Sequence, residues 1–240
     1  MRWDTQLRVA IDYHEPLAVK TMKQIFIESS FSSFADFHDA KWYENIFSLS
    51  EGLAIESAVE DFSSHWWGAS RAFVLPWLLV NGVFDASNGG GGKVKYKQEL
   101  WDKYLTINSF KGALWKTAEG TYGAIYYAYE NLVVSALNIN RKSPCRVTQR
   151  DFNSIVSESF GNSLASKVWN NSFVAVSKEV RNCLVHRGGK TSPALLKMKP
   201  LPMIEGEDIF ISASDVRKLH EELKPKVVLL IEHFASQVSS

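Results

Sequence analysis

Apolar residues recur every three or four positions over most of the chain, which is the spacing that places side chains on one face of an α-helix. The clearest stripes lie over residues 107–137, 172–187 and 214–237. Amphipathic helices bury their apolar faces against one another. The pattern therefore predicts a mainly α-helical protein.

Weaker stripes precede these segments. Residues 15–30, 34–48 and 51–61 each show helical spacing, and residues 64–81 are strongly apolar, which predicts a buried helix. We expect a kink or an interruption at Pro76, because proline lacks the backbone N–H and its ring collides with the preceding turn.

Glycines mark the breaks between helices. Gly161 is expected to separate helices over 149–159 and 163–170, and Gly188-Gly189 are expected to end the helix over 172–187. Two short apolar runs flank Gly206 within residues 203–211, which predicts a small β-hairpin before the last helix. Four consecutive glycines make residues 85–92 a loop or a boundary. The expected organisation is an N-terminal helical region over 1–84, a Gly-rich loop over 85–94 and a helical domain over 95–240.

The composition is that of a protein with a packed core. Hydrophobic residues make up 45% and aromatic residues 12% of the chain, which excludes global disorder. Lys and Arg number 27 against 26 Asp and Glu, so the chain lacks the overall positive charge of a nucleic-acid coat protein, although a local basic patch is compatible with this balance. No apolar region follows Met1, and the run from Ala72 to Val80 is far shorter than the roughly 20 residues of a membrane span. We expect a cytoplasmic protein that does not enter the membrane.

One segment concentrates chemically capable side chains. Arg181, Asn182 and His186 fall near the end of the helix expected over 172–187. Asn182 and His186 are four residues apart and share a helix face. Arg181 lies beside Asn182, roughly 140° around the helix axis from His186. A guanidinium can hold a phosphate, and an imidazole that titrates near neutral pH can move a proton. The set predicts a site for acid–base chemistry at a phosphate.

The Arg-Asn-x3-His pattern near the end of a late helix resembles the Arg-x4–6-His motif of the HEPN superfamily. These are small α-helical domains, many of them metal-independent RNases of toxins and phage-defence systems. A long Tyr-rich helix, the motif helix, a small hairpin and a final amphipathic helix are similar to several HEPN subfamilies over about residues 95–240. The resemblance implies a HEPN-like helical bundle, to which the N-terminal helical region is an addition.

The resemblance also implies an activity, which is a metal-independent endoribonuclease in toxin or anti-phage defence. Attack of the RNA 2′-OH on the scissile phosphate would leave a 2′,3′-cyclic phosphate and a 5′-OH. Arg181, Asn182 and His186 would be catalytic, with His186 transferring protons and Arg181 stabilising the phosphorane. One histidine does not easily act as both base and acid, so the resemblance implies a symmetric homodimer that joins two motifs. It implies RNA as substrate, no metal, no cofactor, and an antitoxin or defence-system protein as a further partner.

Other residues are candidates for supporting roles. The basic residues expected to hold the RNA backbone are Arg187, Lys190, Arg146 and Arg150. Glu130, on the long Tyr-rich helix, is a candidate for orienting Arg181 or His186. The Trp and Tyr stripes lie at helical spacing, so we expect them in the core and not as stacking surfaces for bases.

Three groups of possible metal ligands lack a second ligand pair, so we expect them to be solvated polar faces. They are His14-Glu15, Asp36 with His38 and Asp39, and His220-Glu221-Glu222.

Two further interpretations stay open, because the helix dipole alone favours Arg and His near a helix C-terminus. The domain can be a non-catalytic HEPN-like dimerisation or nucleotide-binding module of a larger complex. Alternatively, it can be a helical interaction protein in which residues 1–82 bind a partner. RNA cleavage that needs Arg181 and His186 separates the ribonuclease hypothesis from both.

Overall fold

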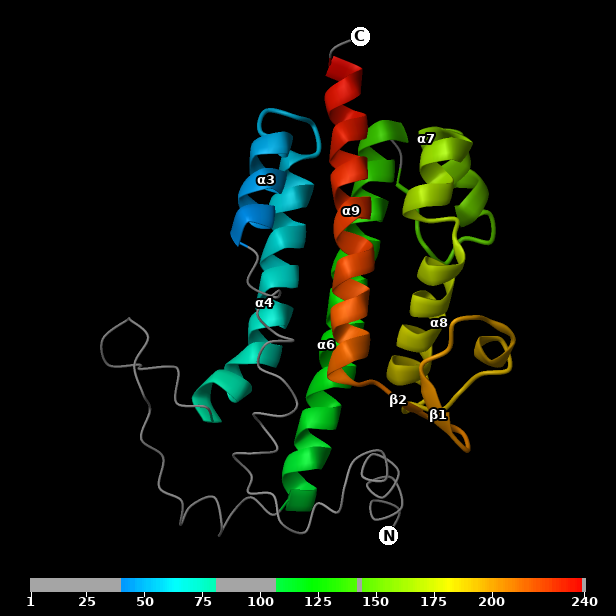
Figure 1. Ribbon diagram of the computed structural model, residues 1–240. Helices are drawn as coiled ribbons and strands as arrows, with labels where there is room; N and C mark the ends of the chain where they lie inside the picture. Colours follow the sequence, from blue (N-terminus) through cyan, green and yellow to red (C-terminus); the bar gives the residue numbers. More distant parts are fainter. Residues whose placement is uncertain (1–39, 81–106, 142–143, 239–240) are drawn as a thin grey trace.

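The computed structural model describes residues 40–80, 107–141 and 144–238, and within these ranges the protein is mainly α-helical, as the apolar stripes predicted. The described elements, labelled in Figure 1, are α3 (Ala40–Ser50), α4 (Glu56–Val80), α6 (Ile107–Arg141), α7 (Phe152–Val168), α8 (Ser172–His186), η3 (Leu195–Lys197), β1 (Met203–Glu205), β2 (Asp208–Phe210) and α9 (Ala213–Val238). The Gly-rich loop over 85–94, the stripe over 15–30 and the groups at His14 and at Asp36 to Asp39 lie outside these ranges.

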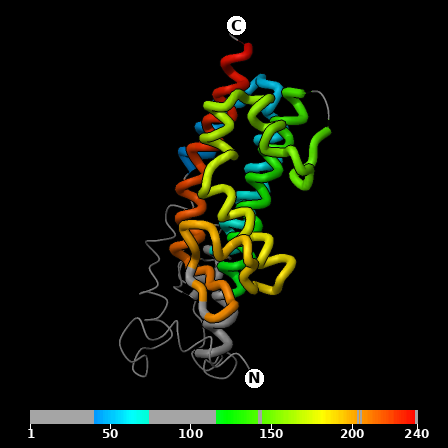
Figure 2. The backbone as a smooth tube through the Cα atoms, turned by 90° about the vertical axis from the view of Figure 1, so that its right-hand side faces the viewer, coloured from blue at the N-terminus to red at the C-terminus, as the bar shows by residue number. Residues whose placement is uncertain are grey.

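Helices α6 and α9 run side by side through the middle of the fold, with α3 and α4 on one flank and α7 and α8 on the other (Figure 1). Figure 2, viewed from the second flank, shows α7 and α8 lying across α6 and α9. Helix α6, whose buried stripe includes Tyr122, Tyr126, Tyr129 and Val133, contacts α4, α7, α8 and α9. A single apolar core extends from α3 to α9. Each large side chain fully buried in it contributes about 1.5–3 kcal/mol to stability.

The segments expected over 51–61 and 64–81 form one helix, α4, which continues past Pro76 to Val80. Figure 1 shows its last turns bending away from the axis of the earlier turns. Proline removes one helix hydrogen bond, but the turns on either side keep theirs, so a bend is a sufficient adjustment. Trp66 is buried while Trp67 is 48% exposed, so α4 is buried on one face only.

A break at Gly161 divides α7 into two helical parts, as the sequence predicted. The backbone of Gly161 has φ 76° and ψ 151°, which residues with a side chain rarely adopt. The second part ends beside α6, where the Tyr129 hydroxyl donates to the Val168 carbonyl. Tyr129 thus ties the end of α7 to the middle of α6.

A short antiparallel pair of strands holds the end of α8. Strand β1 pairs with β2, with Ile204 opposite Ile209, and Gly206 turns the chain with φ 59°. Gly188 and Gly189 take φ values of 63° and 84°, which end α8 in the left-handed region. The Ile209 amide then donates to the Gly189 carbonyl over 2.8 Å. This backbone bond fixes the end of α8 against the strands.

The expectation of a solvated face around His220 is wrong for the histidine itself. His220 is only 4% exposed, and its Nε2 lies 3.0 Å from the Ser70 Oγ of α4. Its ring centroid lies 4.5 Å from that of Trp66. Burial, with a smaller effect from Lys224, lowers the pKa of His220 well below its ordinary value. The neighbouring Glu221 is exposed and pairs with Arg217.

None of the helices in the described ranges is both long and apolar enough to cross a membrane.

Candidate functional site

Helix α8 begins and ends with defined caps, and this places the Arg-Asn-x3-His motif in its last two turns. Asn171 caps the start, where its Oδ1 accepts a hydrogen bond from the Val174 amide over 3.0 Å. The side of α8 that packs into the core carries Val174, Val180 and Cys183. The motif residues are not on this buried side. Arg181 and Asn182 are partly exposed, and His186 is exposed to solvent.

The guanidinium of Arg181 is held by three neighbours. Its Nη1 donates to Asn182 Oδ1 over 3.1 Å, and its Nη2 lies 3.9 Å from Glu130 Oε1. Its Cζ lies 6.0 Å from the centre of the Tyr127 ring, within reach of a cation–π interaction. Glu130 therefore contacts Arg181 from α6.

Glu130 provides a carboxylate with restricted access to water. The residue is 8% exposed, and burial raises the pKa of Glu130, while Arg181 and Lys178 act in the opposite direction. The Tyr126 hydroxyl is also buried and has no hydrogen-bond partner among the described residues. Burial, and secondarily the charge of Glu130, raises the pKa of Tyr126 well above its ordinary range. The inner wall of the site is therefore of low polarity, which strengthens the attraction between Glu130 and Arg181.

His186 stands at the exposed end of α8, one turn beyond Asn182. The carboxamide oxygen of Asn182 is engaged by Arg181, so in this structure Asn182 positions the guanidinium. Val185, beside His186, is 58% exposed. The end of α8 thus presents an imidazole and an apolar side chain together at the surface.

The basic residues expected to hold RNA differ in their exposure and in their ion pairs. Arg187 is exposed directly after His186. Lys190 pairs with Glu207 over 3.1 Å and with Asp208 over 3.8 Å, so its charge is already compensated.

Arg146 and Arg150 are exposed in the connection between α6 and α7, which is anchored by the Cys145 amide on Asn138 Oδ1. Asn138 lies two turns of α6, or about 12 Å, beyond Glu130. No hydrogen bond or ion pair among the described residues joins this connection to Arg181, Asn182 or His186.

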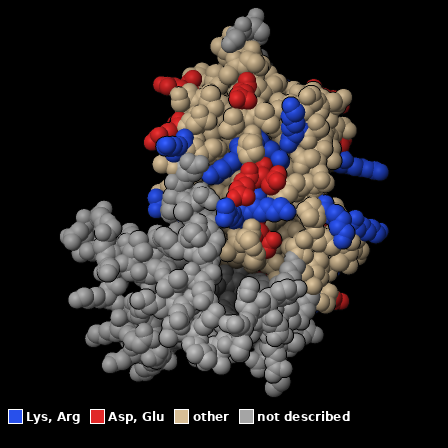
Figure 3. Space-filling view, viewed as in Figure 1, with Lys and Arg blue, Asp and Glu red and all other residues tan. Residues whose placement is uncertain are grey.

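Charges of both signs mix on the face that Figure 3 shows. Helix α9 runs along this face and contributes the pairs Arg217–Glu221 and Lys226–Glu222, each four residues apart. Such pairs cancel most of the long-range field that attracts nucleic acid. A basic surface for RNA would therefore have to be local, as at Arg187.

Tyr127 was missed by the sequence reasoning, which assigned the aromatic stripes to the core. Tyr126 and Tyr129 are buried as expected, but Tyr127 is 46% exposed beside Arg181. The sequence does indicate the exposure of Tyr127, because position 127 lies about 100° around the helix axis from the buried position 126. An aromatic residue at an outward-facing position is a candidate for binding.

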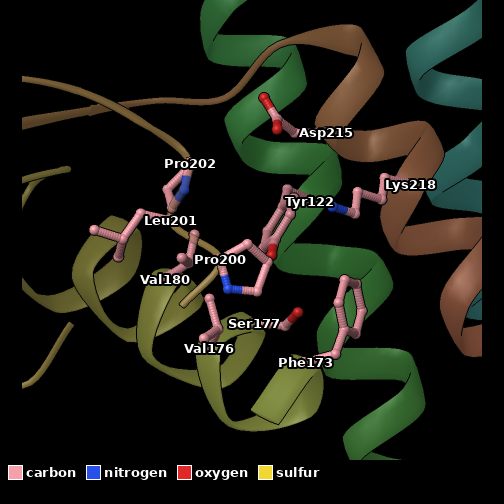
Figure 4. Close-up of a pocket in the computed structure, with 10 residues that line it drawn as sticks. All are labelled: Tyr122, Phe173, Val176, Ser177, Val180, Pro200, Leu201, Pro202, Asp215 and Lys218. Carbon is pink, nitrogen blue, oxygen red and sulfur yellow. The ribbon is translucent and has the colours of Figure 1, made fainter. Parts of the chain in front are cut away.

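A small cavity lies on the side of α8 roughly opposite to Asn182 and His186. Figure 4 shows it between Tyr122 of α6, Ser177 and Phe173 of α8, and Pro200 of the following segment. Its volume of about 50 Å³ suits one or two water molecules, not a nucleotide. It is therefore not the substrate site.

In the described part of the chain, no group of three or more His, Cys, Asp or Glu side chains is placed to hold a metal ion. Comparisons with models of protein families, with curated proteins and with solved structures found no match. The functional assignment depends on the residues of this chain.

Proposed function

We propose that the protein is a metal-independent endoribonuclease of the HEPN type, with Arg181, Asn182 and His186 as its catalytic residues. The observation that carries the proposal is the placement of Arg181 between Asn182, Glu130 and Tyr127, five residues before the exposed His186 on the same helix. A positioned cation and an accessible imidazole near the same helix end suit a reaction in which a phosphate gains charge while a proton moves.

The contacts of Arg181 leave it able to bind substrate. A guanidinium has five N–H donors, and the hydrogen bond to Asn182 uses one of them. The 3.9 Å separation from Glu130 is longer than a hydrogen bond. Arg181 is thus pre-positioned, and its remaining donors can turn to the oxygens of a phosphorane.

The reaction follows from these groups. A histidine accepts the 2′-OH proton, O2′ attacks phosphorus, and the P–O5′ bond breaks as a second histidine protonates O5′. The products are a 2′,3′-cyclic phosphate and a 5′-OH. We propose that the second histidine is His186 of another copy in a symmetric homodimer.

RNA enters the proposal as substrate, with Arg187 holding the backbone beside the motif. Lys190 would have to leave Glu207 to take part, and Arg146 with Arg150 would contact only a longer RNA. A role in toxin or anti-phage defence, with a neutralising protein partner and a cytoplasmic location, belongs to the same proposal.

The alternative function is a non-catalytic HEPN-like module that dimerises or binds nucleotides within a larger complex. The hydrogen bond from Arg181 to Asn182 favours it, because the amide then serves the guanidinium and leaves the imidazole unoriented. This module would bind without cutting.

The test is cleavage of a mixed RNA pool by purified protein and by His186→Ala and Arg181→Ala variants. Each substitution is expected to lower the cleavage rate by about 10²-fold or more while the circular dichroism spectrum stays unchanged. Cleavage should persist in EDTA, and the products should carry cyclic phosphate ends. The matched control is His65→Ala, which removes another exposed histidine, on α4. Cleavage that survives both substitutions, or that EDTA abolishes, contradicts the proposed function.

A further inference from the structure

Helices α3 and α4 lie on the opposite flank of α6 and α9 from α8 (Figure 1), and residues of both line a concave surface. We call it the α3–α4 groove. Its volume is about 610 Å³, which falls in the range of small-molecule sites. Side chains one turn apart on α3 and over two turns of α4 line it, so two facing helices form its walls. The residues used below are Tyr43, Glu44, Phe47, Glu60, Ser63 and Trp67.

Three aromatic rings line the groove, and two of them are unusually accessible. Phe47 is 43% exposed and Trp67 is 48% exposed, while Tyr43 is half-buried and packs edge-on against Trp42 at 5.1 Å between centroids. Aromatic faces carry partial negative charge and attract cations. Trp67 already attracts one cation, since the Arg71 guanidinium lies 4.8 Å from its ring centre.

The charged residues of the groove attract the same kind of ligand as the rings do. Glu44 from α3 and Glu60 from α4 are both exposed at the groove, and they supply two negative charges. Ser63 also lines the groove, although it is only 3% exposed, and its hydroxyl is buried without a hydrogen-bond partner among the described residues. A change of the Ser63 rotamer toward the groove would let a ligand bond this hydroxyl and remove the cost of leaving it without a partner.

We propose that the α3–α4 groove binds a small organic ammonium ion that also carries a hydrogen-bonding group. The alkylated nitrogen lies against the aromatic rings, Glu44 and Glu60 compensate its charge, and Ser63 bonds the polar end. An anion would meet two carboxylates, and a purely apolar ligand would leave those carboxylates partly desolvated without a partner. The inference does not depend on ribonuclease activity.

The test compares choline with 3,3-dimethylbutan-1-ol, a neutral molecule of nearly the same shape, by calorimetric titration of the full chain. Choline is expected to bind at least about fivefold more tightly than the neutral molecule. The double variant Glu44→Gln/Glu60→Gln should lose this preference, and Trp67→Ala should weaken choline binding. The control is Asp61→Asn, which removes an exposed carboxylate of α4 outside the groove and should leave the preference unchanged.

Equal affinity for the two molecules, or no saturable binding of choline, overturns the proposal. A preference for choline that survives in the double glutamine variant overturns the roles assigned to Glu44 and Glu60.

Discussion

Two histidines of this protein lie in opposite environments. His220 of α9 is 4% exposed between Trp66 and Ser70, whereas His186 is exposed at the end of α8. His220 belongs to a polar cluster that joins α4 to α9. His186 lies five residues after Arg181, whose contact with Glu130 joins α8 to α6.

The difference shows how burial decides what a polar cluster can do. Burial holds His220 in its neutral form, out of reach of any substrate, so its hydrogen bond and ring contact can serve only to hold helices together. The groups around His186 reach solvent, where a phosphate can approach them. A histidine in a sequence is therefore a candidate for catalysis only if the packing of its helix leaves it accessible.

The largest expected difference between the two histidines is in how much each stabilises the fold, which matched alanine variants measure. His220→Ala removes ring packing on Trp66 and the contact with Ser70. It is expected to lower the free energy of unfolding by about 2–4 kcal/mol. His186→Ala is expected to change it by no more than about 0.5 kcal/mol, because the side chain is exposed.

Urea denaturation followed by circular dichroism measures both values, with His65→Ala as a second exposed control. A loss for His186→Ala as large as that for His220→Ala would mean that the motif is a structural helix ending.

The second test uses pH. The pKa of His220 is lowered in the folded state, so below about pH 6.5 the unfolded chain binds a proton that the folded chain does not. Stability should fall as pH decreases through this window. From pH 7.5 to 5.5 the loss caused by one such histidine is on the order of 1 kcal/mol. Denaturation of wild type and His220→Gln at both pH values measures it, because glutamine keeps a polar group but does not titrate.

The wild type should lose more stability than the variant over this interval. Equal losses would show that His220 takes up a proton in the folded protein, and so is not held in its neutral form.

The helices of this fold were largely predictable because each buries one periodic face. The stripe of α9 even placed His220 on the buried side, four residues after Val216 and three before Leu223. The expectation of a solvated face came instead from treating His220, Glu221 and Glu222 as a group of possible metal ligands without a second ligand pair. Its partner Ser70 lies 150 residues away, and no local pattern indicates which helices will meet.

The candidate site was predictable to the same extent. Spacing within one helix paired Asn182 with His186, whereas in the structure the Asn182 Oδ1 accepts a hydrogen bond from its sequence neighbour Arg181. The aromatic neighbour came from the docking of α6 against α8, which brings Tyr127 beside Arg181 across 54 positions of the chain. Contacts within a helix follow from its period, whereas contacts between helices depend on how whole faces pack.

The smallest expected effect comes from a second pair of buried and exposed residues, which are two tyrosines of α6 two positions apart. Tyr129 is fully buried and its hydroxyl donates to the Val168 carbonyl, whereas Tyr127 is 46% exposed. Tyr129→Phe is expected to lower the free energy of unfolding by about 1 kcal/mol, since the carbonyl loses its partner away from water. Tyr127→Phe should have almost no effect, because water replaces any lost contact of its hydroxyl. Thermal unfolding of the two variants at one pH measures the difference, and similar shifts in both would show that exposure does not separate the two faces of α6.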